Sequence, residues 1–169
     1  DDIEINVRVQ DIDEIILIGM ELQTSVKNSI ENNEIAEFWK NCFNPRISEI
    51  NDKKKSYVSC AYEVLNPSAD ELYHMACIEV TRENIPANLI CRRLPPMKYV
   101  VFTAKRALNP IEYSILVQYI YGEWLPLSGM EEAEEFTMDM NYSDIYYTVN
   151  YHKLVKKSES KLEIYIPIR

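Results

Sequence analysis

Several features that mark common classes of function are missing from this sequence. It has no run of roughly 18 or more apolar residues and no basic segment leading into an apolar one, so neither a membrane span nor a signal peptide is indicated. Only two histidines are present, and the four cysteines lie far apart without a CxxC pair, so no metal-ligand spacing occurs. We expect no membrane contact, no metal and no cofactor.

Clustered positive charge is also missing. The formal net charge is -9, and the basic residues are scattered apart from the run Lys53-Lys54-Lys55, which is most simply a solvated turn. Nucleic-acid binding through phosphates needs a clustered basic face, so we expect no direct nucleic-acid binding by this segment. No Ser-His-Asp set, Cys-His set or phosphate loop is visible. Separate, reduced thiols fit a cytoplasmic protein.

What is present is the composition of a globular chain. Its 169 residues are 47% hydrophobic and 27% charged, which is enough to bury a core, so a single domain is expected over residues 1–169. The chain begins with Asp1 rather than Met. We therefore expect either a fragment of a longer protein or a chain whose first residues are missing.

Residues 1–83 predict the order strand, helix, strand, strand. An opening strand, interrupted or bent near residues 11–13, leads to an amphipathic helix that should stop before Pro45. Two strands over 57–65 and 72–81 then form a hairpin. The helix is predicted from one apolar face, made by Ile35, Phe38, Trp39, Cys42 and Phe43.

Residues 84–169 repeat this order. A short strand over 89–94 and a clear one over 99–104 precede a second helix. Alternating residues over 136–142, a polar hairpin around 153–160 and a terminal strand follow. The helix boundaries are marked by an N-cap, a proline at the first helical position, a capping-box carboxylate and a closing Pro and Gly, namely Asn109, Pro110, Glu112, Pro126 and Gly129.

These patterns predict an α+β fold. The hairpins imply an antiparallel sheet, because strands joined by short turns run in opposite directions. Two matching strand-helix-strand-strand units can pack about a pseudo-twofold axis. Such packing leaves a ligand groove between the halves, lined by faces of the strands that do not belong to the core.

The terminal strand places one carboxylate where such a groove would be. In KLEIYIPIR, Glu163 and Tyr165 share one face of the strand, and the four aliphatic residues at alternate positions share the other. Glu163 is either a solvated carboxylate on the outside of the sheet, the more common position for this residue type, or a charge inside the groove. The strand alone leaves both readings open.

Three segments carry a resemblance to a known family. KYVVFTAKR at 98–106, YIYGEWLPLSGM at 119–130 and LEIYIPIR at 162–169, with weaker support from IAEFWKNCF at 35–43, resemble the GyrI-like effector-binding domain. This family includes gyrase-inhibitor proteins and the ligand-sensing domains of AraC- and MerR-type bacterial transcription regulators. The resemblance covers nearly the whole chain and implies the same duplicated fold.

The resemblance also implies a site. In drug-sensing members of the family a glutamate on the last strand faces an aromatic pocket and meets lipophilic cations, and Glu163 occupies that place. Coulomb attraction and cation–π contacts would then favour an organic cation. The candidate ligand-binding residues are Glu163, Tyr165, Trp39, Tyr62, Tyr73 and Trp124. Core packing explains the two tryptophans equally well, since aromatic residues at helical spacing are usually buried.

Two departures from the family pattern affect this expectation. Many relatives have a glycine after the YxVF strand, where this chain has Lys105-Arg106, so the turn into the second helix must differ. A Phe-Glu-x-Tyr pattern of relatives is replaced by Phe136-Thr137-Met138-Asp139, which leaves Asp139 as a weak substitute for a second pocket carboxylate.

The resemblance implies a sensor of hydrophobic, cationic small molecules with a helix-turn-helix DNA-binding domain outside this chain. We expect it not to be an enzyme. One alternative is a GyrI-like hydrolase of reactive cyclopropane-containing compounds, in which burial raises the pKa of Glu163 toward the range of general acid–base chemistry. Another is a protein-binding module of the gyrase-inhibitor type.

Overall fold

The computed structural model describes residues 2–55, 58–142 and 161–169. The polar hairpin predicted around 153–160 lies outside these residues, as does His152. No helix in the described part of the chain is long and apolar enough to cross a membrane.

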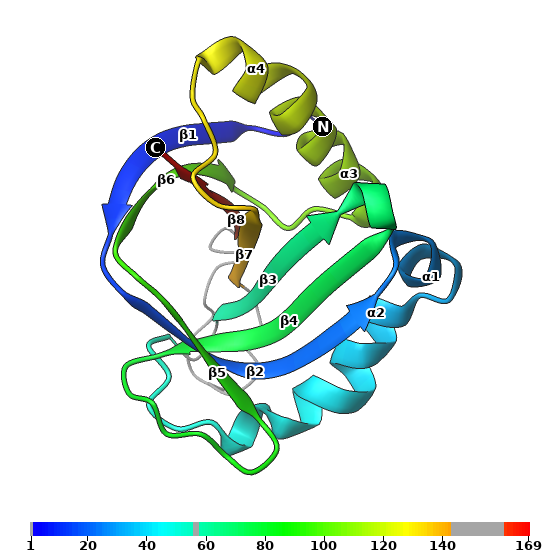
Figure 1. Ribbon diagram of the computed structural model, residues 1–169, viewed down its shortest axis with the longest axis vertical. Helices are drawn as coiled ribbons and strands as arrows, with labels where there is room; N and C mark the ends of the chain where they lie inside the picture. The colour runs from blue at the N-terminus through cyan, green and yellow to red at the C-terminus, as the bar shows by residue number, and fades with distance from the viewer. Residues whose placement is uncertain (1, 56–57, 143–160) are drawn as a thin grey trace, which may run out of the picture.

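Eight strands of the described residues form one strongly curved sheet (Figure 1), in the order β1-β6-β8-β7-β3-β4-β2-β5. Every neighbouring pair is antiparallel, as the short turns predicted. The strands are β1 (Ile5–Ile12), β2 (Ile15–Thr24), β3 (Val58–Asn66), β4 (Glu71–Val80), β5 (Ile90–Leu94), β6 (Met97–Ala104), β7 (Phe136–Tyr142) and β8 (Lys161–Ile168).

The strand order is symmetric about the central β3–β7 pair, with corresponding strands of the two units at equal positions on either side. Strands β2, β4 and β3 of the first unit meet β7, β8 and β6 of the second along the β3–β7 pair. The strand that precedes each unit is exchanged: β1 pairs with β6 of the second unit, and β5 pairs with β2 of the first. The predicted α+β fold and the duplicated strand-helix-strand-strand order are therefore confirmed.

Each unit carries its helices between its first and second strands. The first has α1 (Val26–Glu31), α2 (Glu34–Phe38), the π-helical turn η1 (Trp39–Phe43) and the 3-10 helix η2 (Asn44–Glu49). The second has α3 (Pro110–Tyr119), the π-helical turn η4 (Ile120–Trp124) and α4 (Leu125–Ser128), and a short 3-10 helix η3 (Pro67–Ala69) joins β3 to β4. In both units an α-helix is followed by a π-helical turn and then by a further helical segment with a proline in its first two positions, so Pro126, predicted to close the second helix, lies within α4.

The first helical segment does not stop before Pro45, contrary to the prediction. Pro45 lies in the first two positions of η2, where proline is tolerated. The π-helical turn closes i→i+5 bonds and so rotates the side chains relative to an α-helix. As a consequence Cys42, predicted on the apolar face, is exposed, whereas Phe43 is fully buried.

The start of α3 follows the prediction. The Asn109 side chain accepts a hydrogen bond from the Glu112 amide at 2.8 Å, and Glu112 Oε1 accepts one from the Asn109 amide at 3.2 Å. Arg106, one of the two residues that replace the family's glycine, forms an ion pair with Glu112 at 2.5 Å. The hydrogen bond from Arg106 and that from the Asn109 backbone lower the pKa of Glu112 to about 2.

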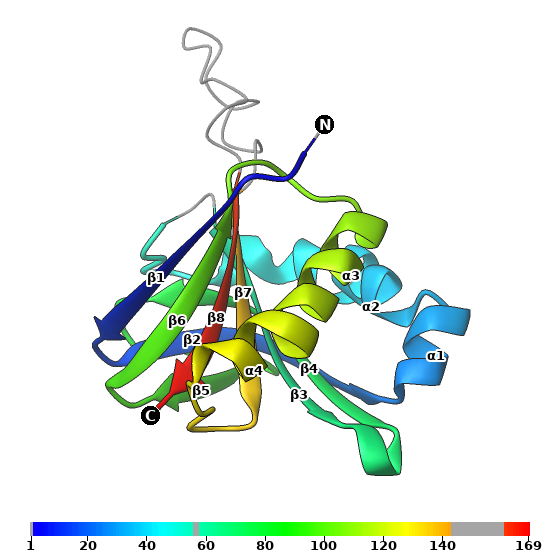
Figure 2. The ribbon, with the colours of Figure 1, turned by 90° about the horizontal axis from the view of Figure 1, so that it is seen from above.

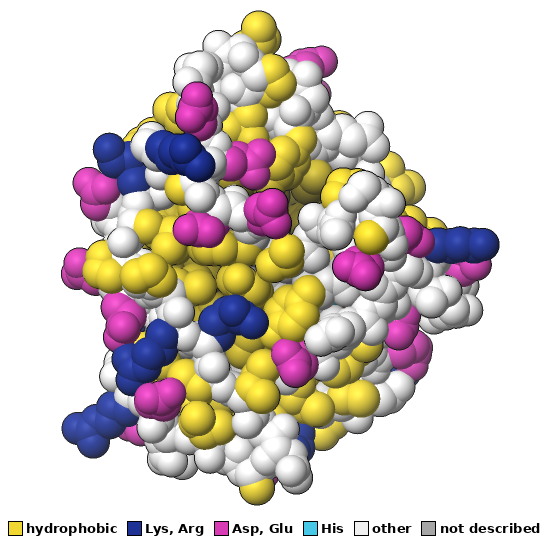
Figure 3. Space-filling model, viewed as in Figure 1, with side chains coloured by type: hydrophobic (Ala, Val, Ile, Leu, Met, Phe, Trp, Pro, Cys, Tyr) yellow, Lys and Arg dark blue, Asp and Glu magenta, His cyan; other side chains and the backbone are white. Residues whose placement is uncertain are grey.

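The sheet has an outer face covered by helices and an inner, concave face (Figure 2). Helices α3 and α4 pack on β6 and β8, and α2 with η1 and η2 packs on β2 and β4. A third apolar cluster lies on the inner face, where hydrophobic side chains gather among basic and acidic ones (Figure 3). Its buried members include Leu17, Cys60, Met75, Cys77, Tyr99, Val101 and Met138.

Candidate ligand-binding site

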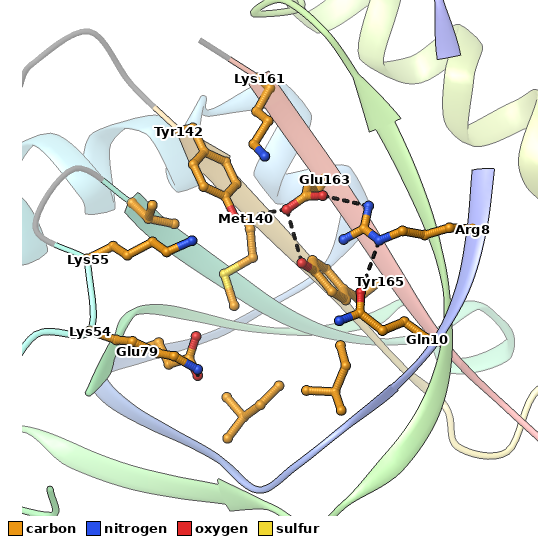
Figure 4. A pocket seen from close by; sticks show the side chains of 13 residues that line it. Arg8, Gln10, Lys54, Lys55, Glu79, Met140, Tyr142, Lys161, Glu163 and Tyr165 are labelled. Carbon is orange, nitrogen blue, oxygen red and sulfur yellow. Dashed lines mark hydrogen bonds and ion pairs between the residues drawn. The ribbon is translucent and has the colours of Figure 1, made fainter. Parts of the chain in front are cut away.

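A cavity of about 370 Å³ lies on the inner face of the sheet (Figure 4). This volume is in the range of sites for small organic ligands. Both halves of the chain line it, and its walls combine apolar side chains with charged ones. The lining residues are Arg8, Gln10, Ile12, Ile15, Lys54, Lys55, Val58, Glu79, Met140, Tyr142, Lys161, Glu163 and Tyr165.

Glu163 is the most enclosed charge of this cavity, with 3% of its surface exposed. Its Oε2 accepts hydrogen bonds from Arg8 Nη1 at 2.8 Å and from Thr103 Oγ1 at 3.1 Å. Its Oε1 accepts from the hydroxyls of Tyr142 at 2.8 Å and of Tyr165 at 3.0 Å. Four side chains from four strands therefore hold this carboxylate, as Figure 4 shows for three of them.

These contacts keep Glu163 ionised. Burial raises the pKa of its carboxyl, but the hydrogen bonds from Tyr142 and Arg8 and the charges of Lys161 and Arg8 outweigh burial, so the pKa lies below its ordinary value. Burial and the neighbouring Glu163 charge raise the pKa of the Tyr165 hydroxyl, which remains a donor at neutral pH. Burial does raise the pKa of Glu163, as the hydrolase alternative assumed, but the net shift is downward because of donors that were not visible in the sequence.

Arg8 is the main residue of the cavity that sequence reasoning missed. Its guanidinium also donates to Thr103 Oγ1 at 3.0 Å and to Gln10 Oε1 at 3.0 Å. The alternation of Val7 and Val9 already placed Arg8 on the opposite face of the first strand. The missing information was that β1 pairs with β6, which in turn pairs with β8 and so brings Arg8 toward Glu163.

Three lysines complete the charged part of the wall. Lys54 forms an ion pair with Glu79 at 3.2 Å. The ammonium groups of Lys55 and Lys161 both lie over the ring of Tyr142, at 5.5 and 4.3 Å from its centroid. The Lys53-Lys54-Lys55 run, interpreted from the sequence as a solvated turn, thus contributes two of its side chains to the cavity.

Tyr62 and Tyr73, two of the predicted site residues, lie on the inner face but do not line this cavity. Their rings hold the guanidinium of Arg92, which lies 4.6 Å from the Tyr62 centroid and 5.3 Å from that of Tyr73. Arg92 also donates to the Tyr73 hydroxyl at 3.2 Å. This aromatic pair therefore already binds a cation supplied by β5.

Trp39 and Trp124 lie on the outer face and are not brought to the cavity. Trp124 packs edge-on against Phe102, with 4.9 Å between ring centroids, in the cluster beneath α3 and α4. Trp39 packs edge-on against Phe43 and donates from Nε1 to His74 Nε2 at 2.8 Å. Both tryptophans are partly buried and pack against the core of their units, close to the alternative that the helical spacing left open.

His74 is buried and paired, although the sequence showed no acidic partner for it. Its Nδ1 lies 2.6 Å from Glu63 Oε1, on the neighbouring strand. Because the indole Nε1 of Trp39 can only donate, His74 Nε2 must accept, and Nδ1 carries the proton that is donated to Glu63. The His74–Glu63 pairing follows from the β3–β4 register and needs the fold to be seen.

Asp139 also faces the outer side and cannot serve as a second carboxylate of the cavity. Its Oδ2 accepts a hydrogen bond from the hydroxyl of Tyr113 on α3, and among the described residues its buried Oδ1 has no partner. Burial raises the pKa of Asp139 to about 7, the Tyr113 hydrogen bond opposes this, and the charge of Glu63 adds to it.

Comparison with known proteins identifies the family. Residues 8–168 match the family model described as Cass2, integron-associated effector binding protein. The chain belongs to this family. The match agrees with the GyrI-like resemblance and supports a ligand-binding role. No curated protein sequence matches the chain.

Solved structures with the same fold share little sequence with this effector-binding protein. SAV2435 bound to tetraphenylphosphonium aligns with a TM-score of 0.66 at 15% identity, covering 97% of this chain and 94% of that one. An integron cassette protein of Vibrio cholerae aligns at 0.60 and 13% identity over 100% of both chains. EcmrR in a complex with DNA aligns at 0.56 and 12% identity, covering 98% of this chain and 57% of that one.

Proposed function

We propose that this chain is the ligand-sensing domain of a bacterial transcription regulator and that the cavity beside Glu163 binds a hydrophobic small molecule. One observation carries the proposal: an ionised carboxylate with 3% exposure lies inside a cavity of about 370 Å³. Apolar walls from Ile12, Ile15, Val58 and Met140 adjoin it. Apolar walls with a few fixed polar groups are the usual composition of a ligand site.

The regulator part of the proposal rests on the family and on a structural relative. The family is one of effector-binding proteins. The chain aligns with 57% of EcmrR, a protein solved in a complex with DNA. We propose that a helix-turn-helix domain of the same polypeptide reads the ligand state of this chain. The test is the reading frame around the segment: a helix-turn-helix coding region joined to it supports the regulator, and a separate frame contradicts it.

The charge of the ligand is a finer question. A cationic ligand, expected from the resemblance, is supported by the ionised Glu163 and by the tetraphenylphosphonium bound to SAV2435. Against it, Arg8 already pairs with the Glu163 carboxylate at 2.8 Å. A cation would gain the full attraction of Glu163 only by displacing Arg8. The function proposed here is therefore the binding of a hydrophobic ligand, whichever sign its charge has.

The hydrolase alternative has less support. A carboxylate that activates water must be able to take up a proton, and the pKa of Glu163 is lowered. Its oxygens already accept from Arg8 and three hydroxyls. No observation favours a gyrase-inhibitor role.

A thermal-shift panel tests the ligand proposal. Cationic, neutral and anionic hydrophobic compounds are added to the purified chain, and a ligand at 100 times its Kd stabilises the folded state by about 2.7 kcal/mol. We expect at least one class to raise the melting temperature. Glu163→Gln and Tyr165→Phe should change the affinity of that class, while Trp124→Phe on the outer face should leave it unchanged. Equal affinity in all four proteins would place the ligand elsewhere.

A further inference from the structure

The cavity is positively charged, in a chain with a net charge of -9. Its lining holds four basic side chains, those of Arg8, Lys54, Lys55 and Lys161. It holds two carboxylates, those of Glu79 and Glu163. Low-dielectric walls strengthen the field of this local excess of positive charge. The cavity therefore attracts anions, although the chain as a whole attracts cations.

The two carboxylates already have partners. Glu163 pairs with Arg8 at 2.8 Å, and Glu79 pairs with Lys54 at 3.2 Å. The hydroxyls of Tyr142 and Tyr165 also donate to Glu163. An incoming cation would therefore meet carboxylates whose charge is compensated.

The remaining two cations form no ion pair in the part of the chain that the structure describes, although the charge of Lys161 contributes to the lowered pKa of Glu163. The ion pairs there involve neither Lys55 nor Lys161. Both ammonium groups lie against the ring of Tyr142, which is a weaker partner than a carboxylate. In Figure 4 both point toward the space between Tyr142, Met140 and Glu163.

We infer that the ligand of this cavity is an amphipathic organic anion, with a carboxylate or similar group held between Lys55 and Lys161 and an apolar body against Ile15, Val58 and Met140. This rests on the proposed function, because it names the ligand class of the same cavity. An anion gains charge-assisted hydrogen bonds from two ammonium groups without breaking the Arg8–Glu163 pair. A cation of the same shape must first displace Arg8 and is repelled by both lysines.

Three probes that share one ring system test the sign of the charge. Titration calorimetry of the purified chain at pH 7.5 and low salt compares 2-naphthoate, 2-naphthylmethanol and 2-naphthylmethylammonium. We expect naphthoate to bind on the order of tenfold more tightly than the ammonium probe, with the alcohol between them. Raising the salt concentration should weaken naphthoate and leave the alcohol nearly unchanged.

Lysine variants locate the contact. Lys55→Gln and Lys161→Gln should each weaken naphthoate about three- to tenfold and leave naphthylmethanol within about twofold. Lys40→Gln is the matched control, because Lys40 is exposed on η1, on the outer face. Melting curves of all variants check that the fold is retained.

The outcomes separate this inference from the proposed function. Tighter binding of the ammonium probe, or equal affinities of all three, would overturn the anionic ligand while the hydrophobic site stands. Unchanged naphthoate affinity in both cavity variants would overturn the assigned contact. If none of the three probes binds and no compound of the thermal-shift panel does, the proposed function falls and this inference falls with it.

Discussion

The guanidinium of Arg8 on β1 and the carboxylate of Glu163 on β8 form an ion pair of 2.8 Å at the wall of the cavity. The carboxylate side of the pair is almost fully buried, whereas 43% of the Arg8 side chain is exposed. A buried carboxylate that loses its cation is costly, since its charge is then uncompensated in a region of low dielectric. The pair thus links the first and last strands of the described sheet.

Arg8→Gln should destabilise the fold at neutral pH. We expect a loss of about 1–2 kcal/mol in urea unfolding at pH 7, less than for a fully buried pair because Arg8 is partly solvated. The pKa of Glu163 is lowered in the folded state, so the stability it contributes is present above its unfolded pKa of about 4.3 and is lost as the pH falls through the folded value. The difference between the two proteins should therefore shrink below about pH 4.

Arg8→Lys is the matched control, because it keeps the charge and should restore part of the loss. A variant Arg8→Gln that is as stable as the wild type at pH 7 would show that the pair contributes nothing measurable. The same variant should bind cationic probes more tightly than the wild type, since Glu163 then has one competitor fewer.

Asp139 has the opposite dependence on pH. Its pKa is raised to about 7 from the ordinary 3.8, mainly by burial, so the folded state binds a proton that the unfolded state releases. The stability that proton binding at Asp139 contributes is therefore fully present below the unfolded pKa, and it is lost as the pH rises to about 7. Asp139→Asn removes the charge and keeps an acceptor for Tyr113. We expect it to melt at a higher temperature than the wild type at pH 8 and at a similar one near pH 4.

Between pH 4 and pH 8 the ionisation of Asp139 lowers the free energy of unfolding by on the order of 2–4 kcal/mol. Asp13→Asn serves as the control, because Asp13 is exposed between β1 and β2 and should give the same melting temperatures as the wild type. A drop in melting temperature of Asp139→Asn at both pH values would contradict a buried, destabilising charge.

Trp39→Phe tests the separation of the two faces. The change removes the donor to His74 Nε2, which should cost about 1 kcal/mol of stability, more if the imidazole nitrogen is left without a partner. Because Trp39 lies on the outer face, the affinity of any ligand of the Glu163 cavity should stay within about twofold in a calorimetric titration. A tenfold loss of affinity would instead restore the expectation that this tryptophan contacts the ligand.

Much of the fold was readable from the sequence because its signals are local. The capping box at Asn109 and Glu112 and the alternation around Glu163 depend on neighbouring residues only, and each matches the structure. The predicted end of the first helix was wrong, because a π-helical turn and a 3-10 helix continue the helical segment past Pro45. Neither leaves a distinct pattern of apolar residues.

The site was harder to predict, because its composition depends on pairing between distant strands. The placement of Glu163 and Tyr165 was predictable from the alternation of one strand and from its resemblance to the GyrI-like family. Their role in ligand binding stays a prediction. Arg8 reaches Glu163 only through the β1–β6 and β6–β8 pairs, and Lys55 comes from the segment before β3. The tryptophans were ambiguous for a related reason: helical spacing identifies a buried face but not the side of the sheet on which it lies.

The exchange of β1 and β5 between the two units has a consequence for assembly. Among the described strands β1 lies at an edge of the sheet and pairs with β6 alone, and it joins β2 through the short segment at Asp13 and Glu14. If β1 left its own β6 and added to that of another copy, the two chains would form a domain-swapped dimer with unchanged strand pairing. Each cavity would then hold Arg8 from one copy and Glu163 from the other, so a single ligand would contact two polypeptides.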